Sequence, residues 1–338
     1  MSAGGERFLV TGALGFIGAW TVRSLVREGT PVTTFDLGGS DRRLRQIMTA
    51  DELARVKFES GDITDLAALE SALDRNGTTN VIHLAALQVP SCRADPPLGA
   101  RVNVLGTINI FEAVKRAMAA RSAGAMAPIV YTSSIGMFEL NDVDPSTGRL
   151  GAEAAAHPTN HYGVYKLANE GNARVYWLDD GLSSVALRPL TVYGVGRDQG
   201  MTSGPTKAIV AAVLGRPYTV PFRGPTLYQY AEDVAGTLIA ASRSSIRGAH
   251  AFNLPGALAD GPAFLASIEA AVPGASELIS FQPVDLPFPA EIDHDGIEQL
   301  GPVSITPLAE GIAASAAIYE GLARAGRLDP AAHGLDPV

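Results

Sequence analysis

Three polar side chains, Tyr162, Lys166 and Ser134, have the types and spacing that proton transfer requires. Tyr162 and Lys166 are four residues apart, so on a helix they would share one face. An ammonium group there would lower the pKa of the phenol, ordinarily about 10, and make the phenolate a usable base. Ser134 follows an apolar run typical of a strand, and its hydroxyl would hydrogen-bond the reacting oxygen. The same tyrosine–lysine spacing also occurs on solvated helix faces, so the interpretation depends on the neighbouring motifs.

A glycine-rich segment, residues 11–18, follows the first apolar run and precedes a stretch with helical periodicity. Glycines in this arrangement permit a tight turn, a close approach of the backbone to a pyrophosphate and close packing of the helix. The first N–H groups of the helix would bind the phosphate oxygens. The residues that we assign to this contact are Gly12, Gly15, Phe16, Ile17 and Gly18. A plain glycine-rich turn is the alternative interpretation.

Asp36 argues against that alternative, because it ends the second apolar run, eighteen residues after Gly18. A carboxylate at this position would accept hydrogen bonds from the ribose hydroxyls of an adenosine. Its negative charge would also repel the 2′-phosphate of NADP, although Arg42 and Arg43 nearby would weaken that repulsion. The sequence therefore predicts a dinucleotide cofactor and favours NAD over NADP.

These motifs lie in a regular alternation of short apolar runs and longer stretches of helical periodicity. We expect strands at residues 7–11, 31–35, 56–59, 80–84, 128–132 and 183–187. We expect helices at residues 16–28, 65–75, 97–120 and 161–179. Such a series predicts the α/β class, with a doubly wound parallel sheet of the Rossmann type. Ligands of such sheets bind at the carboxyl ends of the strands, which would bring Ser134 and the glycine-rich segment together.

The alternation weakens after residue 190, where glycine and proline become frequent. We expect three parts: a dinucleotide-binding domain at residues 1–190, a smaller mixed α/β substrate-binding lobe at residues 191–330 and a tail at residues 331–338. Within the lobe, helical composition is found at residues 205–214, 232–242 and 307–325. Arg197 and Lys207 would flank the mouth of the site, either as contacts for an anionic substrate or within an exposed charged loop.

Composition and charge exclude several classes of protein. The 26 Lys and Arg residues are scattered and outnumbered by 35 Asp and Glu residues, so we expect no nucleic-acid partner. No apolar run reaches about 18 residues, so we expect no membrane contact. Cys92 is the single cysteine, and residues 1–8 lack the features of a signal peptide, so we expect a cytoplasmic protein.

Two further groups, a histidine pair and the single cysteine, are weak candidates for a metal site and a nucleophile. His157 and His161 are separated by Pro158, which interrupts a helix, and no third ligand is near in the sequence, so we expect no metal. Cys92 precedes Arg93, whose charge would lower the pKa of the thiol. A bystander thiol is nevertheless the favoured interpretation over a nucleophile.

Eight short motifs together resemble those of the extended short-chain dehydrogenase/reductase superfamily, in its NAD-dependent epimerase/dehydratase family. The motifs are residues 11–18, Gly61-Asp62-Ile63, His83-Leu84-Ala85-Ala86, Asn103 with Gly106-Thr107, Tyr131-Thr132-Ser133-Ser134, Tyr162 with Lys166, Arg188-Pro189 and residues 230–235. They cover most of residues 6–240. The resemblance implies that Tyr162 moves the proton of a hydroxyl while a hydride passes to or from the nicotinamide of NAD.

The resemblance also implies roles for single residues. Asp62 and Ile63 would flank the adenine, Asn103 would support the active-site helix, and Pro189 would approach the nicotinamide amide. Lys166 would bind the nicotinamide ribose. The cofactor contacts that we expect are Gly12, Gly15, Phe16, Ile17, Gly18, Asp36, Asp62, Ile63, Leu84, Ala85, Ala86, Asn103, Thr132, Tyr162, Lys166 and Pro189. The expected substrate contacts are Gln88, Ser134, Thr191 and Arg197.

Three departures from the family pattern narrow the expected function. Ser134 is followed by Ile135-Gly136-Met137 rather than by the acidic pair of the dehydratases, which disfavours dehydration. Residues 222–230 lack the Gly-Asp-Gly and Arg-Asp-Phe runs of the nucleotide-sugar enzymes. The loop at residues 194–204 also matches no nucleotide-sugar pattern beyond its first glycine.

We therefore expect an NAD-dependent oxidoreductase that acts on a secondary alcohol of a sugar, a sugar acid or a related small hydroxy compound. A nucleotide-sugar 4-epimerase with tightly bound NAD is the first alternative, and a catalytically silent NAD-binding regulator is the second. The presence of Ser134, Tyr162 and Lys166 together argues against the regulator. The expected partner is thus a small molecule, and we also expect a homodimer.

Overall fold

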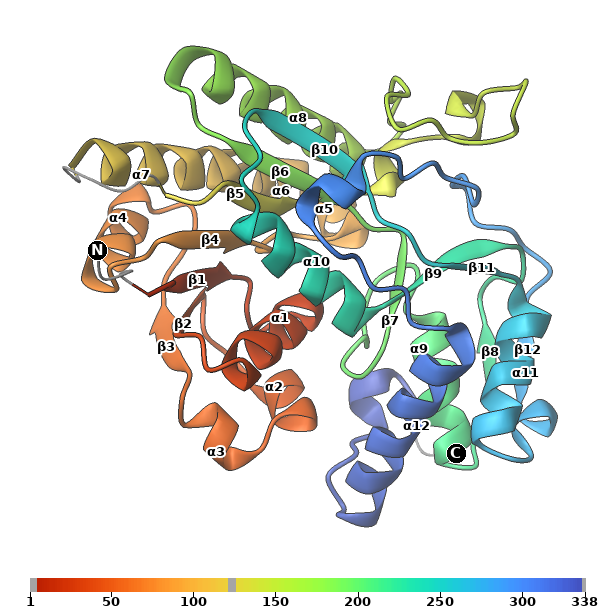
Figure 1. Ribbon diagram of the computed structural model, residues 1–338. Coiled ribbons are helices and arrows are strands. Elements are labelled where there is room, and N and C mark those ends of the chain that lie inside the picture. The colour runs from red at the N-terminus through yellow and green to blue at the C-terminus, as the bar shows by residue number, and fades with distance from the viewer. Residues whose placement is uncertain (1–4, 121–125, 336–338) are drawn as a thin grey trace.

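The computed structural model describes residues 5–120 and 126–335, which are arranged around one parallel sheet (Figure 1). Within these residues the sheet has seven strands in the order β10-β6-β5-β4-β1-β2-β3, and every adjacent pair is parallel. The strands are β1 (Phe8–Thr11), β2 (Val32–Asp36), β3 (Lys57–Ser60), β4 (Asn80–His83), β5 (Ile129–Thr132), β6 (Ser184–Arg188) and β10 (Ala249–Asn253). The chain order reverses between β1 and β4, so the carboxyl ends of these two strands leave a crevice for a ligand. The expected doubly wound α/β fold is confirmed.

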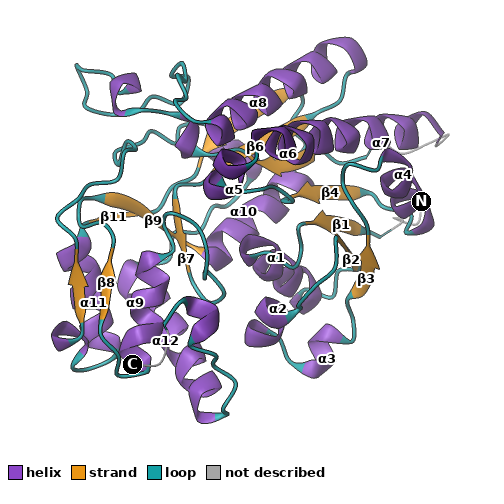
Figure 2. Cartoon of the chain, turned by 180° about the vertical axis from the view of Figure 1, so that it is seen from behind, coloured by secondary structure: helices purple, strands orange, loops and turns teal. Residues whose placement is uncertain are grey.

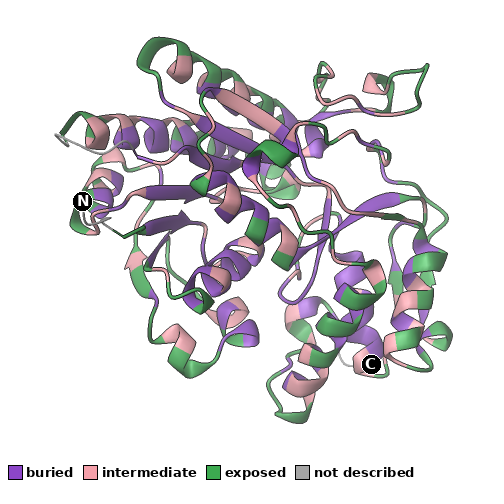
Figure 3. Ribbon diagram, in the orientation of Figure 1, coloured by how far each residue is buried: buried purple, intermediate pink, exposed green. Residues whose placement is uncertain are grey.

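Helices cover both faces of the sheet (Figures 1 and 2). They are α1 (Phe16–Arg27) and α10 (Ala231–Arg243) on one face and α4 (Leu66–Arg75), α7 (Gly106–Ala120) and α8 (His161–Asp180) on the other. In β1, Phe8 and Val10 belong to the hydrophobic core on the α1 side, whereas Leu9 belongs to the core on the α7 side. Both faces of the strand are buried (Figure 3), which explains why such strands appear in the sequence as continuous apolar runs.

The helix expected at residues 97–120 is divided in the structure. It consists of α6 (Pro96–Ala100), a π-helical turn at Arg101–Leu105, and α7. Such wider turns inside helices are frequent at functional sites. Here the turn contains Asn103, which contacts the active-site helix as described below.

Within the described residues before β5, three short α-helices appear where none was expected. They are α2 (Arg42–Ile47), α3 (Ala50–Leu53) and α5 (Val89–Ala94). None is longer than six residues, which is less than two helical turns and too short to show an apolar periodicity.

Most residues after β6 form a second part beside the sheet. It contains β7 (Thr191–Tyr193), β8 (Tyr218–Val220), β9 (Thr226–Tyr230), β11 (Ala257–Ala259), β12 (Ile279–Phe281), α9 (Gly204–Val213), α11 (Gly261–Ala271) and α12 (Leu308–Arg324). Although they follow residue 190, α10 and β10 lie on the central sheet. The division at residue 190 therefore stays a prediction, and residues 336–338 of the expected tail lie outside the described residues.

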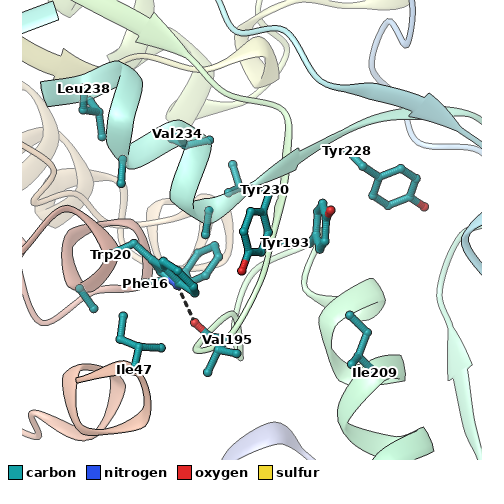
Figure 4. Packing of buried hydrophobic residues seen from close by; sticks show 14 of the residues in the cluster. Phe16, Trp20, Ile47, Tyr193, Val195, Ile209, Tyr228, Tyr230, Val234 and Leu238 are labelled. Atoms are coloured by element: carbon teal, nitrogen blue, oxygen red, sulfur yellow. Dashed lines mark hydrogen bonds between the residues drawn. The ribbon is translucent and has the colours of Figure 1, made fainter. Parts of the chain in front are cut away.

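Aromatic side chains join the two parts (Figure 4). Trp20 on α1 packs edge-on against Tyr230, and Tyr230 lies beside Tyr193, with 5.5 Å between the ring centroids in each pair. The indole nitrogen of Trp20 donates a 2.9 Å hydrogen bond to the carbonyl oxygen of Val195. Because Val195 lies at the start of the loop at residues 194–204, this contact holds the loop that carries Arg197 against α1.

Candidate active site

The glycine-rich turn between β1 and α1 is closed by backbone contacts that leave no room for a side chain at Gly12 or Gly18. Gly12 has a φ of +65°, and a Cβ atom there would lie 2.5 Å from the backbone nitrogen of Ala85. A Cβ atom on Gly18 would lie 2.3 Å from the carbonyl oxygen of Gly12. A Cβ atom on Gly15 would meet that same oxygen at 3.0 Å and would otherwise point into open space. The turn thus leaves the first N–H groups of α1 uncovered, as the binding of a pyrophosphate requires.

Asp36 ends β2 and lies beside this turn. Its Oδ2 atom accepts a 3.1 Å hydrogen bond from the backbone N–H of Leu14. Burial raises the pKa of the Asp36 carboxyl, although the backbone N–H groups of Leu14 and Leu37 and the charge of Arg43 oppose this rise. Asp36 lines a cavity of about 480 Å³, named here the Asp36 cavity. Its walls also include Asp62, Ile63, Leu84, Ala85 and Ala86.

Asn103 connects the loop after β4 to α8. Its Oδ1 atom accepts a 2.7 Å hydrogen bond from the N–H of Leu87, and its Nδ2 atom donates one of 2.9 Å to the carbonyl of Leu87. The carbonyl of Asn103 accepts a 2.8 Å hydrogen bond from Nδ2 of Asn169 on α8. Asn103 is buried behind the cavities and does not line them. Its position agrees with the supporting role that the resemblance implies, rather than with a direct cofactor contact.

Tyr162 lies in the first turn of α8, which is capped by Asn160. The Asn160 Oδ1 atom accepts a 2.9 Å hydrogen bond from the N–H of Gly163. A Cβ atom on Gly163 would lie 3.0 Å from the carbonyl oxygen of Gly136, so the helix closely approaches the segment after β5. This approach brings Tyr162 within hydrogen-bond reach of Ser134. The Oγ atom of Ser134 also accepts a 2.9 Å hydrogen bond from the N–H of Gly136.

Lys166 lies one turn further along α8, as expected. Its Nζ atom donates a 2.5 Å hydrogen bond to the carbonyl of Thr132 and lies 5.5 Å from the centroid of the Tyr162 ring. Burial lowers the pKa of Lys166 to about 8. Burial also raises the pKa of Tyr162, while the hydrogen bond from Ser134 and the charge of Arg197 oppose the rise. The sequence predicts that Lys166 lowers the pKa of the phenol. In the structure the pKa of Tyr162 is raised instead, because burial has the largest effect, and the cation that opposes the rise is Arg197.

Arg197 faces Tyr162 from the loop at residues 194–204. Its Cζ atom lies 5.6 Å from the centroid of the Phe16 ring, and its Nη2 atom donates a 3.2 Å hydrogen bond to the hydroxyl of Thr202. Its Nε atom is buried without a hydrogen-bond partner, and the guanidinium forms no ion pair with any residue that the structure describes. Burial lowers the pKa of the guanidinium from its very high ordinary value. The charge of Asp198 acts on Arg197 without a direct ion pair, so the site contains a cation that no described residue contacts with a carboxylate.

A second cavity, of about 230 Å³, adjoins the Asp36 cavity at the glycine-rich turn and is named here the Tyr162 cavity. The expected site residues that line it are Gly12, Gly15, Phe16, Ile17, Gly18, Leu84, Ala86, Gln88, Thr132, Ser134, Tyr162, Lys166, Pro189 and Arg197. Together the two cavities unite every expected cofactor contact except Asn103.

Thr191 is the exception among the expected substrate contacts. It is fully buried in β7, and its hydroxyl shares a 2.8 Å hydrogen bond with the hydroxyl of Thr226 in the same small sheet. It is therefore not free to bind a substrate. Conversely, several hydrophobic residues that sequence analysis missed line the Tyr162 cavity, among them Leu87, Met201 and Phe288. These three come from separate loops, and no motif marks them.

The other candidate groups lie outside these cavities. The Nδ1 atom of His157 pairs with Asp142 at 2.6 Å, and His161 stacks on Tyr165. Cys92 is buried, and its burial raises the pKa of the thiol. Over residues 5–120 and 126–335, no group of three or more His, Cys, Asp or Glu side chains is placed to hold a metal ion. In the same residues, no helix is both long and apolar enough to cross a membrane.

Comparison with known proteins relates this geometry to one family. The sequence pattern of the NAD dependent epimerase/dehydratase family matches residues 8–254. UDP-glucuronate 4-epimerase 2 of Arabidopsis thaliana is 33% identical over 196 residues, which cover 56% of this chain and 43% of that protein. UDP-glucose 4-epimerase of Mycolicibacterium smegmatis is 32% identical over 209 residues, which cover 62% of this chain and 63% of that protein. The matches thus span less than two thirds of the length of these curated relatives.

Solved structures share the fold over almost the whole chain. A partial consensus L-threonine 3-dehydrogenase superposes with a TM-score of 0.79 at 22% identity, covering 93% of this chain and 99% of that one. The UDP-glucose 4-epimerase of Thermus thermophilus, solved in complex with NAD, has a TM-score of 0.72 at 25% identity, with the same coverage. The side-chain-free turn at Gly12 and Gly18 and the carboxylate of Asp36 fit such a dinucleotide.

Proposed function

Because the chain belongs to the NAD-dependent epimerase/dehydratase family and NAD is the cofactor, we propose that it oxidises or reduces a secondary alcohol of a sugar acid or related small hydroxy compound. The observation that carries this proposal is the cavity in which Tyr162, Ser134 and the unpaired Arg197 meet. When bound, NAD supplies a nicotinamide ring that accepts or returns a hydride. The glycine-rich turn and Asp36 would hold its pyrophosphate and its adenosine ribose.

The proton of the substrate hydroxyl would be moved by Tyr162. The phenolate oxygen takes this proton during oxidation, and Ser134 donates a hydrogen bond to the same substrate oxygen. Burial disfavours the phenolate, so the reaction needs nearby positive charge to stabilise it. Arg197, on the loop that faces Tyr162, supplies such charge. Lys166 lies on the helix that carries Tyr162, with its Nζ atom 5.5 Å from the centroid of the ring.

Arg197 favours an acidic substrate over a neutral one. A buried cation without a partner costs free energy, which an anionic ligand would recover. The planar guanidinium can bind a carboxylate through two parallel hydrogen bonds. Its Nε atom has no partner, and its Nη2 atom is bonded to Thr202 alone among the described residues. A sugar acid would place its carboxylate at this position.

A nucleotide-sugar 4-epimerase is the alternative that the names of the relatives favour. Its substrate would bring a diphosphate, which requires several cations. Lys207 and Arg223 line neither cavity, and Arg216 donates a 2.9 Å hydrogen bond to the carbonyl of Leu335 instead. Of these residues and Arg197, only Arg197 lines the Tyr162 cavity, which favours a single carboxylate over a diphosphate.

The experiment that tests this proposal is a screen of substrates with NAD. Uronic acids and other sugar acids are expected to reduce NAD, as seen by absorbance at 340 nm, whereas UDP-sugars are expected to give no turnover. Calorimetry with UDP should show no binding. Micromolar binding of UDP, with epimerisation but without net reduction of NAD, would establish the epimerase instead. If the protein bound NAD but turned over no substrate, the catalytically silent NAD-binding regulator would be the remaining interpretation.

We also propose that two copies of the chain associate through α8. Val164, Leu167, Val175 and Leu178 lie on one side of this helix and are between 37% and 67% exposed. Such an apolar stripe is typically covered by another protein surface, and a second copy would present the same stripe. Light scattering of Leu178→Glu is expected to give the monomer mass, and an unchanged dimer mass would reject this interface. The expected cytoplasmic location also stays a prediction.

A further inference from the structure

A buried carboxylate connects the loop at residues 194–204 to the rim of the Asp36 cavity. The Asp198 side chain is 2% exposed and pairs with two arginines at the start of α2. Its Oδ1 atom accepts a 2.7 Å hydrogen bond from Nη2 of Arg43, and its Oδ2 atom pairs with Nη2 of Arg42. Burial alone would raise the pKa of Asp198, but the hydrogen bonds and charges of the two arginines hold it below its usual value. Asp198 is therefore ionised at neutral pH.

The same two arginines line the Asp36 cavity. Arg42 and Arg43 contribute to its wall together with Ser40 and Asp36. An arginine beside the adenosine ribose is the feature by which a dinucleotide site accommodates the 2′-phosphate of NADP. Judged by residue types alone, this rim would bind NADP as soon as Asp36 were removed.

The hydrogen bonds of the two guanidinium groups are directed elsewhere. Arg43 donates from Nε to the carbonyl of Gly196 and from Nη1 to the carbonyl of Leu14, both at 3.1 Å, and from Nη2 to Asp198. Arg42 is joined to Asp198 through its Nη2 atom, and its Nη1 atom is buried without a hydrogen-bond partner among the described residues. The two positive charges are balanced by the negative charges of Asp198 and Asp36, so little net charge remains for a phosphate.

We propose that Asp198 is a second determinant of cofactor choice, which keeps Arg42 and Arg43 from binding a 2′-phosphate and so adds to the selectivity for NAD that Asp36 provides. This inference rests on the placement of the adenosine of NAD in the Asp36 cavity. A carboxylate on the substrate side of the site thus determines which cofactor the other side accepts. The site discriminates against NADP because Asp198 already neutralises the arginines that would bind the 2′-phosphate.

The test is a double-mutant cycle in cofactor affinity. Calorimetry would give the dissociation constants of NAD and NADP for the unmodified protein, Asp36→Ala, Asp198→Asn and the double variant. Asp36→Ala alone is expected to raise the affinity for NADP by about tenfold or less, because Asp198 still holds the guanidinium groups. In the double variant we expect a further gain of about tenfold or more, the scale of charge-assisted hydrogen bonds to a phosphate. The double effect should exceed the product of the single ones.

Asp41→Asn is the matched control for this cycle. Asp41 precedes α2 and pairs at 2.7 Å with the exposed Arg45, and neither residue lines the cavity. The control removes one negative charge near the same helix start without releasing Arg42 or Arg43. It is expected to change the affinity for NADP by less than about twofold in the Asp36→Ala background. Equal effects of Asp41→Asn and Asp198→Asn would overturn the proposal, because net charge alone would then explain both.

A third variant keeps the proposal testable if Asp198→Asn unfolds the loop. In the Asp36→Ala background, Arg42→Met is expected to leave the affinity for NADP within about twofold, because Asp198 already balances the charge of this guanidinium. A tenfold loss would show that Arg42 binds the phosphate despite Asp198, and would contradict the proposal. The affinity of the unmodified protein for NAD is a separate result. If the unmodified protein did not bind NAD, the proposed function would be rejected. If it bound NAD but the effects of the two substitutions on NADP affinity were additive, only the role of Asp198 would be rejected.

Discussion

The two sides of the site are held in place by different kinds of contact. On the cofactor side, backbone approaches backbone: Gly12 lies against Ala85, and Gly18 lies against Gly12. On the substrate side, the loop at residues 194–204 is held by side chains of distant elements, among them Trp20 on α1. A backbone contact of this kind admits no additional atom, whereas side-chain contacts can be lost one at a time. We infer that the cofactor side determines whether the site forms, and that the substrate side determines what it accepts.

The largest effect is therefore expected from Gly18→Ala. Its new Cβ atom would lie 2.3 Å from the carbonyl oxygen of Gly12 and 2.7 Å from the Cα atom of Ala13, so the turn would have to open. The cost should exceed the about 1–3 kcal/mol of ordinary overpacking, because both clashing atoms belong to the backbone. We expect a lower melting temperature and no NAD binding detectable by calorimetry.

Gly236→Ala is the control for this variant. Gly236 is exposed within α10, and a Cβ atom there would meet nothing within 4 Å. Alanine in an exposed helix is more stable than glycine by about 1 kcal/mol, so the melting temperature should rise slightly with NAD binding unchanged. If Gly18→Ala behaved like Gly236→Ala, the turn would not limit cofactor binding, and the contrast between the two sides would fail.

The next largest effect is expected from Tyr162→Phe, where the two sides meet. Loss of the phenol should lower turnover by about 100-fold or more, the usual scale for general acid–base help, with the affinity for NAD nearly unchanged. Tyr165→Phe on the same helix is the control, because its hydroxyl donates to the carbonyl of Pro96 instead. Lys166→Ala should lower both turnover and NAD affinity. Full activity of Tyr162→Phe on a confirmed substrate would refute the proposed mechanism.

The contrast also explains which parts of the molecule the sequence predicts. Gly12, Gly18 and Asp36 belong to one strand–helix–strand unit, so their relative positions follow from a short stretch of sequence. The spacing of Tyr162 and Lys166 is likewise set within one helix. Six of the seven sheet strands agree with the sequence prediction for a similar reason, since most of them are continuous apolar runs. The seventh, β10, is partly exposed and follows the irregular region, so no such run marks it.

The substrate side depends on tertiary packing that a single sequence does not reveal. The sequence predicts that Thr191 contacts the substrate. In the structure its hydroxyl is instead hydrogen-bonded to the hydroxyl of Thr226 on another strand of a small sheet. Phe288 and Met201 reach the cavity from loops without a motif. Arg42 and Arg43 are expected from the sequence to weaken the selectivity for NAD, yet the carboxylate that neutralises them lies more than 150 residues away in the chain.

A smaller effect, confined to the substrate side, is expected from Arg197→Gln. The loss of charge-assisted hydrogen bonds to a carboxylate should raise KM for a sugar acid by about 10- to 100-fold, with NAD affinity unchanged. The charge of Arg197 opposes the raised pKa of Tyr162, so its removal should raise that pKa further. The rise of kcat/KM with pH, which follows deprotonation of Tyr162, should then shift to higher pH.

Arg223→Gln is the control for this substitution. Arg223 is exposed in the same lobe and lines neither cavity, so KM and the pH profile should stay unchanged. A loss of NAD affinity in Arg197→Gln would assign the guanidinium to the pyrophosphate of the cofactor instead of the substrate. An equal rise in KM for a neutral sugar would likewise reject the carboxylate contact.

The smallest effect concerns one of the side chains that hold the substrate loop. Tyr319 on α12 is fully buried, and its hydroxyl oxygen accepts a 3.0 Å hydrogen bond from the N–H of Gly196, one residue before Arg197. A comparable hydroxyl, that of Tyr176 on α8, donates a 2.8 Å hydrogen bond to the carboxylate of Glu112, away from both cavities. The two tyrosines therefore allow the same atom to be removed beside the loop and away from it.

Tyr319→Phe leaves the buried N–H of Gly196 without its partner, which should cost about 1–3 kcal/mol in the free energy of unfolding. Because the loop carries Arg197, we expect KM for a sugar acid to rise by about two- to fivefold, while the affinity for NAD stays the same. Tyr176→Phe should lower stability less, because Glu112 is partly exposed and can bind water, and it should not change KM. If both variants left KM unchanged, Arg197 would be positioned by the remaining contacts at Trp20 and Arg43. If Tyr319→Phe weakened NAD binding as strongly as it raised KM, the two sides of the site would be coupled rather than independently held.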